Sequence, residues 1–335
     1  MHDGYTTPRA LDTALKDYAK RQAKSVKDVG ALRRSFFFQR LAARVFVADP
    51  DGWMIKGGQA LLLRYSTDAR LSKDIDMQRA DSGASLDEAV QALRAAASLD
   101  LKDHLTFVPT RLEPHGDESG GARQSFDVQL GLRKSESIHV DLVVGRSPTA
   151  VPEVALLKPA VSMPWPADWP KVRLYPVVDH MADKICAMYE WRGTVPSSRF
   201  RDLADLLLIS QRETVDAAQA RHALHTEAAR RASGGALLRL PKAFEMPHES
   251  WRAGYPRAAA DLTGLEGCDT WDAAAVAADA FLTPLLSADF TGRWDPAAYR
   301  WQSDPLTPLH RRNPDLPEQR GKTQGFASGA SAPLL

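Results

Sequence analysis

Two aspartates separated by one residue, Asp74 and Asp76, are the strongest candidates for chemistry in this sequence. On an extended chain, residues i and i+2 project to the same face about 7 Å apart, so their carboxylates can converge. Two such anions about 4 Å apart repel each other by roughly 4 kcal/mol at an effective dielectric constant near 20. A divalent cation removes this repulsion, and hard oxygen ligands favour a Mg²⁺ ion that also binds substrate phosphates. A solvated acidic turn has the same pattern.

A pair of glycines, Gly57-Gly58, precedes the aspartates and follows a short apolar segment, Trp53–Ile55. A helix is expected from Gln59 to Tyr65. Glycine lets the backbone approach a ligand closely, and a helix N-terminus offers unpaired N–H groups to a phosphate. A Gly-Gly pair alone is more often only a turn. The order of Gly-Gly, helix and Asp-x-Asp is more specific, because it combines a phosphate-binding turn with two metal-binding carboxylates.

A third carboxylate, Asp141, lies in one of two segments with alternating apolar residues, 126–132 and 138–144. This period of two is typical of half-buried strands, so we expect a hairpin with residues 133–137 between the strands. Asp141 is out of phase with its apolar neighbours and should face away from the core. Either it is a solvent-facing residue, or it is a third metal ligand or the base for an acceptor hydroxyl.

Lys184 and Asp202 are candidates from the second half of the chain. Lys184 lies at the edge of an apolar stripe at helical spacing, formed by Val178, Met181, Ile185, Met188 and Tyr189. Such a lysine either extends its ammonium to water or supplies a point charge to a triphosphate. Asp202 would lie in the first turn of a helix capped by Ser197 or Ser198, where the helix dipole alone favours an acid.

The 335 residues are enough for two domains. We expect an N-terminal α/β domain with a mixed sheet and N-terminal helices over residues 1–155. A proline-rich connector should cover 156–176, and a mostly helical domain over 177–302 should complete a nucleotide cleft. The tail 303–335, rich in Pro, Gly and Ser, is expected to be disordered.

Composition excludes several classes of protein. The net charge of +1 argues against wholesale polyanion binding, although residues 8–48 hold ten Lys or Arg against three Asp. That cluster is either a solvated helix face or a phosphate-contacting surface. Two cysteines exclude a disulfide framework or a cysteine zinc site. The sequence shows neither a signal-peptide pattern nor a membrane-spanning run, so a cytoplasmic location without membrane contact is expected.

Two groups of motifs carry a family resemblance. The segment from Lys56 to Leu61, with Arg64 and the run from Arg70 to Asp76, resembles the first motif of the AbiEii/AbiGii toxin family of nucleotidyltransferases. The segments 180–187 and 198–206 resemble the later Lys motif and Arg-Asp-x-x-Asp motif of that family. The family includes the MenT toxins and belongs to the DNA polymerase β-like superfamily. The resemblance covers about residues 30–210 and extends more loosely to 300.

The resemblance implies that the Asp pair binds metal, that the Gly pair holds a triphosphate, and that Lys184 and Asp202 complete the site. With the residue pattern, the candidate catalytic residues are Asp74, Asp76, Asp141, Lys184 and Asp202, of which the first three are candidate metal ligands. The candidate nucleotide-binding residues are Gly57, Gly58, Gln59, Arg64, Ser72 and Lys184. Gln59 stands where the family usually has Ser or Thr.

The expected function is a Mg²⁺-dependent nucleotidyltransferase, with Mn²⁺ as a possible substitute, that moves a nucleotide from an NTP to an acceptor hydroxyl. The resemblance implies a toxin of a toxin–antitoxin or phage-defence system, with a tRNA 3′ end as acceptor and a cognate antitoxin as a possible partner. Basic residues would guide the RNA, namely Lys24, Lys27, Arg33, Arg34 and Arg40.

Three alternatives stay open at this point. The acceptor hydroxyl could belong to a protein or a small molecule. The chain could be an inactive nucleotide-binding or partner-binding module, for which Gln59 counts slightly and the intact Asp pair counts against. A hydrolase using the same carboxylates would usually show a His-rich metal pattern, which this sequence lacks.

Overall fold

The computed structural model describes residues 4–115, 120–164, 169–191, 193, 195, 197–287 and 290–303. These residues belong to one unit that ends at Ser303. The tail that was expected to be disordered, 303–335, lies outside the described residues except for Ser303. Within the described residues, no helix is long and apolar enough to cross a membrane.

Two helices begin the chain, as the hydrophobic spacing predicts. The first, α1 (Pro8–Gln22), starts at the expected cap, where Thr7 Oγ1 accepts a hydrogen bond from the backbone N–H of Ala10 at 3.1 Å. The second, α2 (Val26–Ala48), starts six residues before the expected run and is buried from Ser35 to Phe46. Its aromatic and aliphatic side chains form much of the core beneath the sheet.

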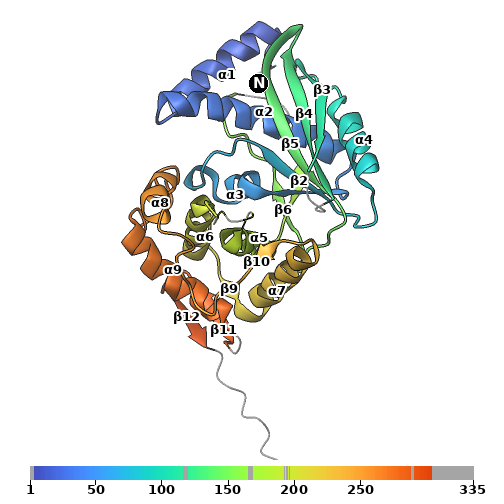
Figure 1. Ribbon diagram of the computed structural model, residues 1–335. Helices are drawn as coiled ribbons and strands as arrows, with labels where there is room; N and C mark the ends of the chain where they lie inside the picture. Colours follow the sequence, from blue (N-terminus) through green and yellow to red (C-terminus); the bar gives the residue numbers. More distant parts are fainter. Residues whose placement is uncertain are drawn as a thin grey trace, which may run out of the picture. The chain divides into compact units, whose positions relative to one another are not determined.

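A seven-stranded mixed sheet follows, which confirms the expected fold class (Figure 1). Its strands lie in the order β3-β4-β5-β2-β1-β7-β6. Parallel pairs join β2 to β5 and β1 to β7, and the remaining neighbours are antiparallel. The strands are β1 (Trp53–Lys56), β2 (Ile75–Arg79), β3 (Leu105–Pro114), β4 (Gly121–Leu130), β5 (Arg133–Val143), β6 (Glu153–Leu156) and β7 (Lys171–Leu174).

Helices cover one face of this sheet. Helix α4 (Leu86–Ala97) contacts α2 and the strands β3, β4 and β5, and α2 also contacts β5, so these helices pack on the same side. Alternate strand residues, such as Ile75, Val140 and Leu142, point into this core. The residues between them, Asp76 and Asp141 among them, therefore face the opposite side of the sheet.

Two details differ from the sequence expectation. The β4–β5 hairpin is confirmed, but Leu130 pairs with Arg133, so residues 133–137 belong to the strand. Gly131, with φ of +60°, allows the tight turn that replaces the expected longer loop. The range expected to be a connector contains β7, which pairs with β1 and is the strand next to the edge of the sheet. The strand has only two buried apolar residues, Val172 and Leu174, which is too short an alternation to predict a strand in a proline-rich segment.

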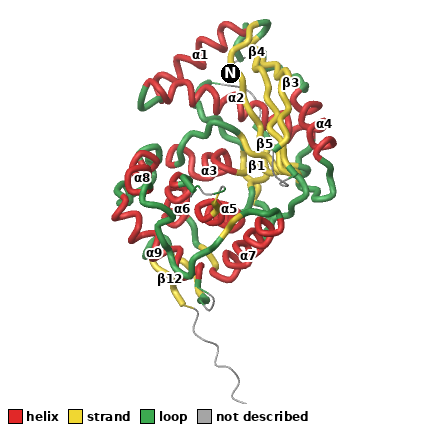
Figure 2. Tube along the Cα trace, viewed as in Figure 1, coloured by secondary structure: helices red, strands yellow, loops and turns green. Residues whose placement is uncertain are grey.

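The second half of the described chain is mostly helical, as expected (Figure 2). Its helices are α5 (Val177–Tyr189), α6 (Phe200–Arg212), α7 (Ala217–Ser233), α8 (Trp251–Ala259) and α9 (Trp271–Leu286). Short strands lie between these helices or follow the last of them, namely β8 (Glu190–Trp191), β9 (Val215–Asp216), β10 (Leu237–Leu238), β11 (Gly292–Asp295) and β12 (Arg300–Ser303).

Helix α3 (Gly57–Tyr65), followed by the short 3-10 helix η1 (Ser66–Asp68), links the two halves. Ala60 and Leu63 pack into the core beneath the sheet, whereas Leu61 and Leu62 pack into the core of the helical half. One helix therefore contributes to two cores. The expected domain boundaries at 155 and 177 stay a prediction.

Candidate active site

Four charged residues form a row across four neighbouring strands, on the face of the sheet opposite α2 and α4. In the strand register, Lys56 on β1 lies beside Asp76 on β2, and Asp76 lies beside Asp141 on β5. Asp141 in turn lies beside Arg123 on β4. The side-chain alternation that buries the apolar neighbours places all four on one face. This register brings Asp141, the third candidate carboxylate, beside Asp76.

The Gly pair lies directly against this row. Gly57 has a φ of +60°, and a Cβ there would lie 1.7 Å from Asp76 Oδ2. A Cβ on Gly58 would lie 2.9 Å from Ser72 Oγ. Any side chain at Gly57 would therefore displace the carboxylate. No side chain of the described residues caps the first turn of α3, so its N–H groups are available to a phosphate beside the carboxylates.

The three carboxylates of the site have different partners. Asp141 accepts two hydrogen bonds from Arg123, both at 2.8 Å, and Asp74 accepts one from Ser72 Oγ at 3.1 Å. Arg123 Nη2 also lies 3.9 Å from Asp74 Oδ2. Asp76 has no hydrogen bond or ion pair with any described residue. Burial, reinforced by the nearby charges of Asp74 and Asp141, raises the pKa of Asp76 to about 7.

Replacing Asp76 by Asn should stabilise the metal-free protein at pH 8 but not at pH 4. The native pKa of Asp76 is raised above its unfolded value, so the native state binds the extra proton, and this carboxyl lowers stability as pH rises from about 4 to about 7. Each tenfold shift in the ionisation constant corresponds to about 1.4 kcal/mol of stability. Water at the partly exposed carboxylate reduces the destabilisation, so we expect Asp76→Asn to raise the free energy of unfolding at pH 8 by about 2 kcal/mol.

Urea unfolding of both proteins with a chelator present would measure this gain. Equal free energies of unfolding at pH 8 would contradict the raised pKa of Asp76.

The donor set at this site fits a hard divalent cation. All three carboxylates offer oxygen ligands, and Asp76 is without another partner among the described residues. No three His, Cys, Asp or Glu side chains of the described residues group closely enough to hold an ion alone. A Mg²⁺ ion typically uses one or two carboxylates and takes further ligands from water and substrate phosphates. Asp141, bound by Arg123, is the least available of the three.

Lys184 is buried and ion-paired, which rules out the interpretation that its ammonium extends to water. Its Nζ donates to Asp202 Oδ1 at 2.9 Å and to Asp205 Oδ2 at 2.6 Å. Burial would lower the pKa of Lys184, but the two carboxylates outweigh it and the pKa is raised. Burial likewise opposes ionisation of Asp202, yet Lys184 and Arg199 hold its pKa well below the usual range. Both groups are therefore charged at neutral pH.

Two arginines complete this buried network. Arg70 donates to both oxygens of Asp205, at 3.1 and 2.9 Å, and Arg199 donates to Asp202 at 2.6 Å. Three cations thus surround two carboxylates. Asp202 lies in the first turn of α6 as expected, but Arg199 takes the capping position and Ser197 Oγ donates to the carbonyl of Ala187.

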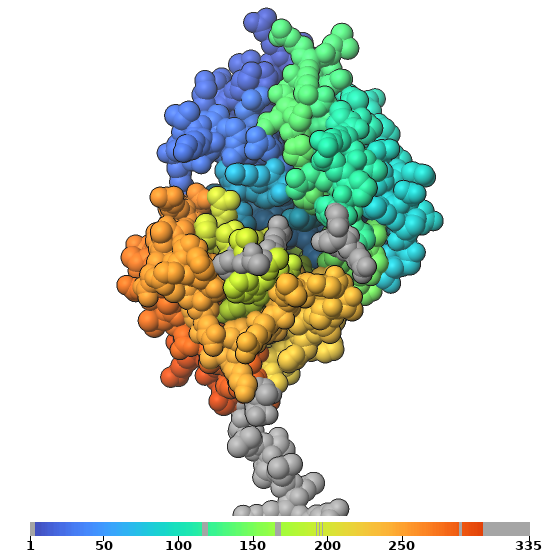
Figure 3. Space-filling view, viewed as in Figure 1, coloured from blue at the N-terminus to red at the C-terminus, as the bar shows by residue number. Residues whose placement is uncertain are grey.

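A cavity of about 410 Å³ connects the two groups of residues. Its lining includes Gly57 and Asp76 from the sheet half and Lys184 and Asp202 from the helical half. Figure 3 shows the surface hollowed where the blue and cyan N-terminal elements meet the yellow-green segment of α5 and α6. The structure therefore brings together the predicted phosphate turn, one predicted metal ligand and the predicted Lys–Asp pair around one space.

Other predicted residues lie outside the lining of this cavity. Arg64 donates to the carbonyl of Tyr175 at 2.6 Å and pairs with Glu153 at 3.2 Å. Gln59 is buried within α3, and its Nε2 has no hydrogen-bond partner among the described residues. Ser72 Oγ donates its hydrogen bond to Asp74 Oδ1. Nucleotide contacts by these three residues stay predictions.

Sequence reasoning missed several residues of the site. Lys56 lies in the quoted first motif, and its Nζ pairs with Asp183 Oδ2 at 2.9 Å while lying 3.9 Å from the ring centre of Tyr175. Asp205 lies in the quoted Arg-Asp-x-x-Asp motif, three residues after Asp202, and so on the same face of α6. That spacing is a local signal that could have identified Asp205. Arg123 could not be found without the register of β4 and β5.

Comparison with known proteins shows the family of this chain. The family model described as "Nucleotidyl transferase AbiEii toxin, Type IV TA system" matches residues 39–277, which is well over half of the chain. The chain belongs to this family. As an AbiEii protein it is a nucleotidyltransferase of a toxin family, which confirms the resemblance found in its motifs.

Two solved structures are similar to this AbiEii protein. One is MenT4, a nucleotidyltransferase toxin from Mycobacterium tuberculosis H37Rv, with a TM-score of 0.48 and 16% identity over 80% of this chain and 93% of that chain. The other is a putative nucleotidyltransferase from H. pylori, with a TM-score of 0.35 and 16% identity over 58% of this chain and 75% of that chain. No curated protein matches the sequence.

Proposed function

We propose that this AbiEii protein transfers a nucleotide from an NTP to the 3′ hydroxyl of a tRNA, with Mg²⁺ or Mn²⁺, as the toxin of a pair with a cognate antitoxin. One observation carries the proposal. Three features surround one cavity, namely the N-terminus of α3, the buried Lys184, and Asp76, which has no partner in the part of the chain that the structure describes. Such a space suits a triphosphate and a cation together. Because the proposed substrates are an NTP and a tRNA, we expect the reaction to take place in the cytoplasm.

The residues of the chain have separate tasks in this reaction. The N–H groups after Gly57 and the ammonium of Lys184 bind the triphosphate, and Asp202 and Asp205 hold that ammonium in position. Asp74 and Asp76 hold the cation, which when bound stabilises the charge on the phosphate that is attacked. Asp141, fixed by Arg123, lies on the same face and can accept the hydrogen bond of the acceptor hydroxyl.

The basic surface for RNA differs from the one expected from sequence. Arg40 is buried and pairs with Asp103 at 2.8 Å, so it is not available to RNA. Arg33 pairs with Asp12 at 2.9 Å, and Arg34 pairs with Glu136 at 2.6 Å. Carboxylates of the described residues therefore neutralise the three arginines of α2 that were expected to guide the acceptor stem.

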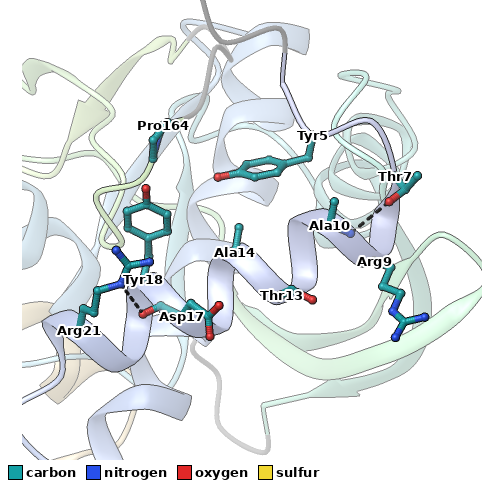
Figure 4. A pocket seen from close by; sticks show the side chains of 10 residues that line it. All are labelled: Tyr5, Thr7, Arg9, Ala10, Thr13, Ala14, Asp17, Tyr18, Arg21 and Pro164. Carbon is teal, nitrogen blue, oxygen red and sulfur yellow. Dashed lines mark hydrogen bonds between the residues drawn. The ribbon is translucent and has the colours of Figure 1, made fainter.

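A groove of about 660 Å³ along α1 is a better candidate for RNA. It is lined by Tyr5, Tyr18, Arg9 and Arg21 among others, and Arg21 stacks over the Tyr18 ring at 4.3 Å. Figure 4 shows the two tyrosine rings on the same side of α1 as Pro164, with Arg21 beside Tyr18. Aromatic rings beside exposed arginines bind single-stranded nucleic acid by stacking and by phosphate contact.

Replacing Arg9 and Arg21 together by Ala should weaken tRNA binding. It should also make the dependence of log affinity on log salt less steep, by about one to two units, because each lost phosphate contact removes somewhat under one unit from the slope. The matched control is Arg33→Ala with Arg34→Ala, where the lost charges were already paired with carboxylates. Filter binding at several salt concentrations measures both slopes. An unchanged slope for the α1 variant would exclude this groove as the RNA surface.

The acceptor is tested by incubating the purified protein and Mg²⁺ with each α-labelled NTP and total RNA. We expect label in RNA of tRNA size, removable together with the 3′-terminal nucleotides. Label only in protein or in a small molecule would replace the acceptor in this proposal, and no transfer with any NTP would contradict it entirely.

A further inference from the structure

His180 is a buried residue of the cavity to which the mechanism above gives no task. It lies on α5, one helical turn before Lys184, and the residue is 2% exposed. It belongs to the lining of the same cavity as Gly57 and Lys184. Neither ring nitrogen, Nδ1 nor Nε2, has a hydrogen-bond partner among the described residues. A buried polar group without a partner costs free energy, which suggests that a ligand supplies one.

The charges around His180 indicate the chemistry of that ligand. Burial and then the neighbouring ammonium of Lys184 lower the pKa of His180 well below its usual value, and Arg64 and Lys56 add to this effect. The ring is therefore neutral, with one N–H donor and one acceptor nitrogen. The surrounding cations cannot accept the hydrogen bond, and Asp183, the carboxylate whose charge raises the pKa of the ring, is bound by Lys56 at 2.9 Å. An acceptor that is itself an anion would satisfy both the ring and the cations.

We propose that His180 donates its ring N–H to a phosphate oxygen of the bound NTP and is a triphosphate-binding residue beside Lys184. The inference rests on the proposed function and adds a contact to it. Its residue type suits the position, since a neutral ring donates to the anion without adding a further buried charge beside Lys56 and Lys184. A water molecule in the cavity is the competing partner for the ring.

The test compares three replacements of His180 in the full chain. His180→Leu keeps the volume and removes both nitrogens, whereas His180→Asn and His180→Gln restore a donor at one of the two ring positions. Inorganic tripolyphosphate and each NTP are titrated by calorimetry. We expect Leu to lower the affinity for tripolyphosphate about 10- to 150-fold, the range for a lost hydrogen bond to a charged group. One of the two amide variants should recover part of it.

Stability separates binding from folding. Because the ring nitrogens have no protein partner among the described residues, His180→Leu should keep or raise the urea midpoint while it weakens binding. His222→Leu, an exposed position on α7, is the control and should change neither. Tripolyphosphate should also raise the pKa of His180, followed by the NMR shift of its ring carbons, since an anion favours the charged ring.

The outcomes distinguish this inference from the function on which it rests. If the wild-type protein binds tripolyphosphate and NTP, and His180→Leu binds both equally well, the ring contacts only water and the inference is overturned. If the wild-type protein binds neither ligand, the proposed function fails together with it. Weaker binding accompanied by an equal loss in the urea midpoint would assign His180 a structural role and also overturn the inference.

Discussion

Replacing Asp76 by Asn should reduce nucleotide transfer at least about a thousandfold and leave the protein folded. A cation that stabilises the attacked phosphate contributes several kcal/mol to catalysis, and each 1.4 kcal/mol corresponds to about a tenfold change in rate. Asp76 is the carboxylate of the row without a partner among the described residues, so its loss removes the ligand most available to the cation. Transfer of α-labelled nucleotide under single-turnover conditions measures the effect.

Asp127→Asn is a suitable control for this substitution. Asp127 lies on the same face of the sheet, on β4, but binds Ser137 and Lys134 on the adjacent strand. Its replacement should leave transfer unchanged. Asp74→Ala should behave like Asp76→Asn. Wild-type turnover in a folded Asp76→Asn or Asp74→Ala protein would remove these residues from the cation site.

Replacing Lys184 by Met should lower the use of the triphosphate about 10- to 150-fold, the range for a lost charge-assisted contact of roughly 1.5–3 kcal/mol. The free energy of unfolding should decrease less than the use of the triphosphate does. Without Lys184, Asp202 keeps Arg199 and Asp205 keeps Arg70, so two carboxylates still face two arginines. The buried network has one positive charge in excess, and Lys184→Met removes that charge.

Asp205→Asn is the matched contrast within the same network. Asp205 is fully buried and binds both Arg70 and Lys184, so its loss leaves three cations around Asp202 alone. Breaking a buried ion pair in this way typically costs about 3–5 kcal/mol of stability. Urea unfolding and nucleotide titration of both variants separate the two roles. If Lys184→Met is as unstable as Asp205→Asn but binds nucleotide normally, Lys184 is only structural.

The local parts of the site were predictable from the sequence. Asp74 and Asp76 were expected to share a face because extended chains have a period of two, although β2 begins only at Ile75. The Gly pair before a helix is a local pattern as well. Alternation in residues 138–144 correctly placed Asp141 on the face away from the core. Each of these predictions depends on residues that are close together in the chain.

The nonlocal parts were not predictable in this way. The row from Lys56 to Arg123 depends on the pairing of four strands from distant segments. The burial of Arg40 depends on Asp103, 63 residues away, so a basic helix face looked exposed in the sequence. A charge count along one segment could not show that its arginines are matched by carboxylates elsewhere.

One measurement tests the central claim most directly, namely that this site transfers the nucleotidyl group. The wild-type protein is incubated with Mg²⁺, tRNA and the same NTP labelled either at the α-phosphate or at the γ-phosphate. The account predicts that the α label enters RNA, that the γ label leaves as pyrophosphate, and that Asp76→Asn does neither. Transfer of the γ label, release of both labels without incorporation, or equal incorporation by Asp76→Asn would contradict it.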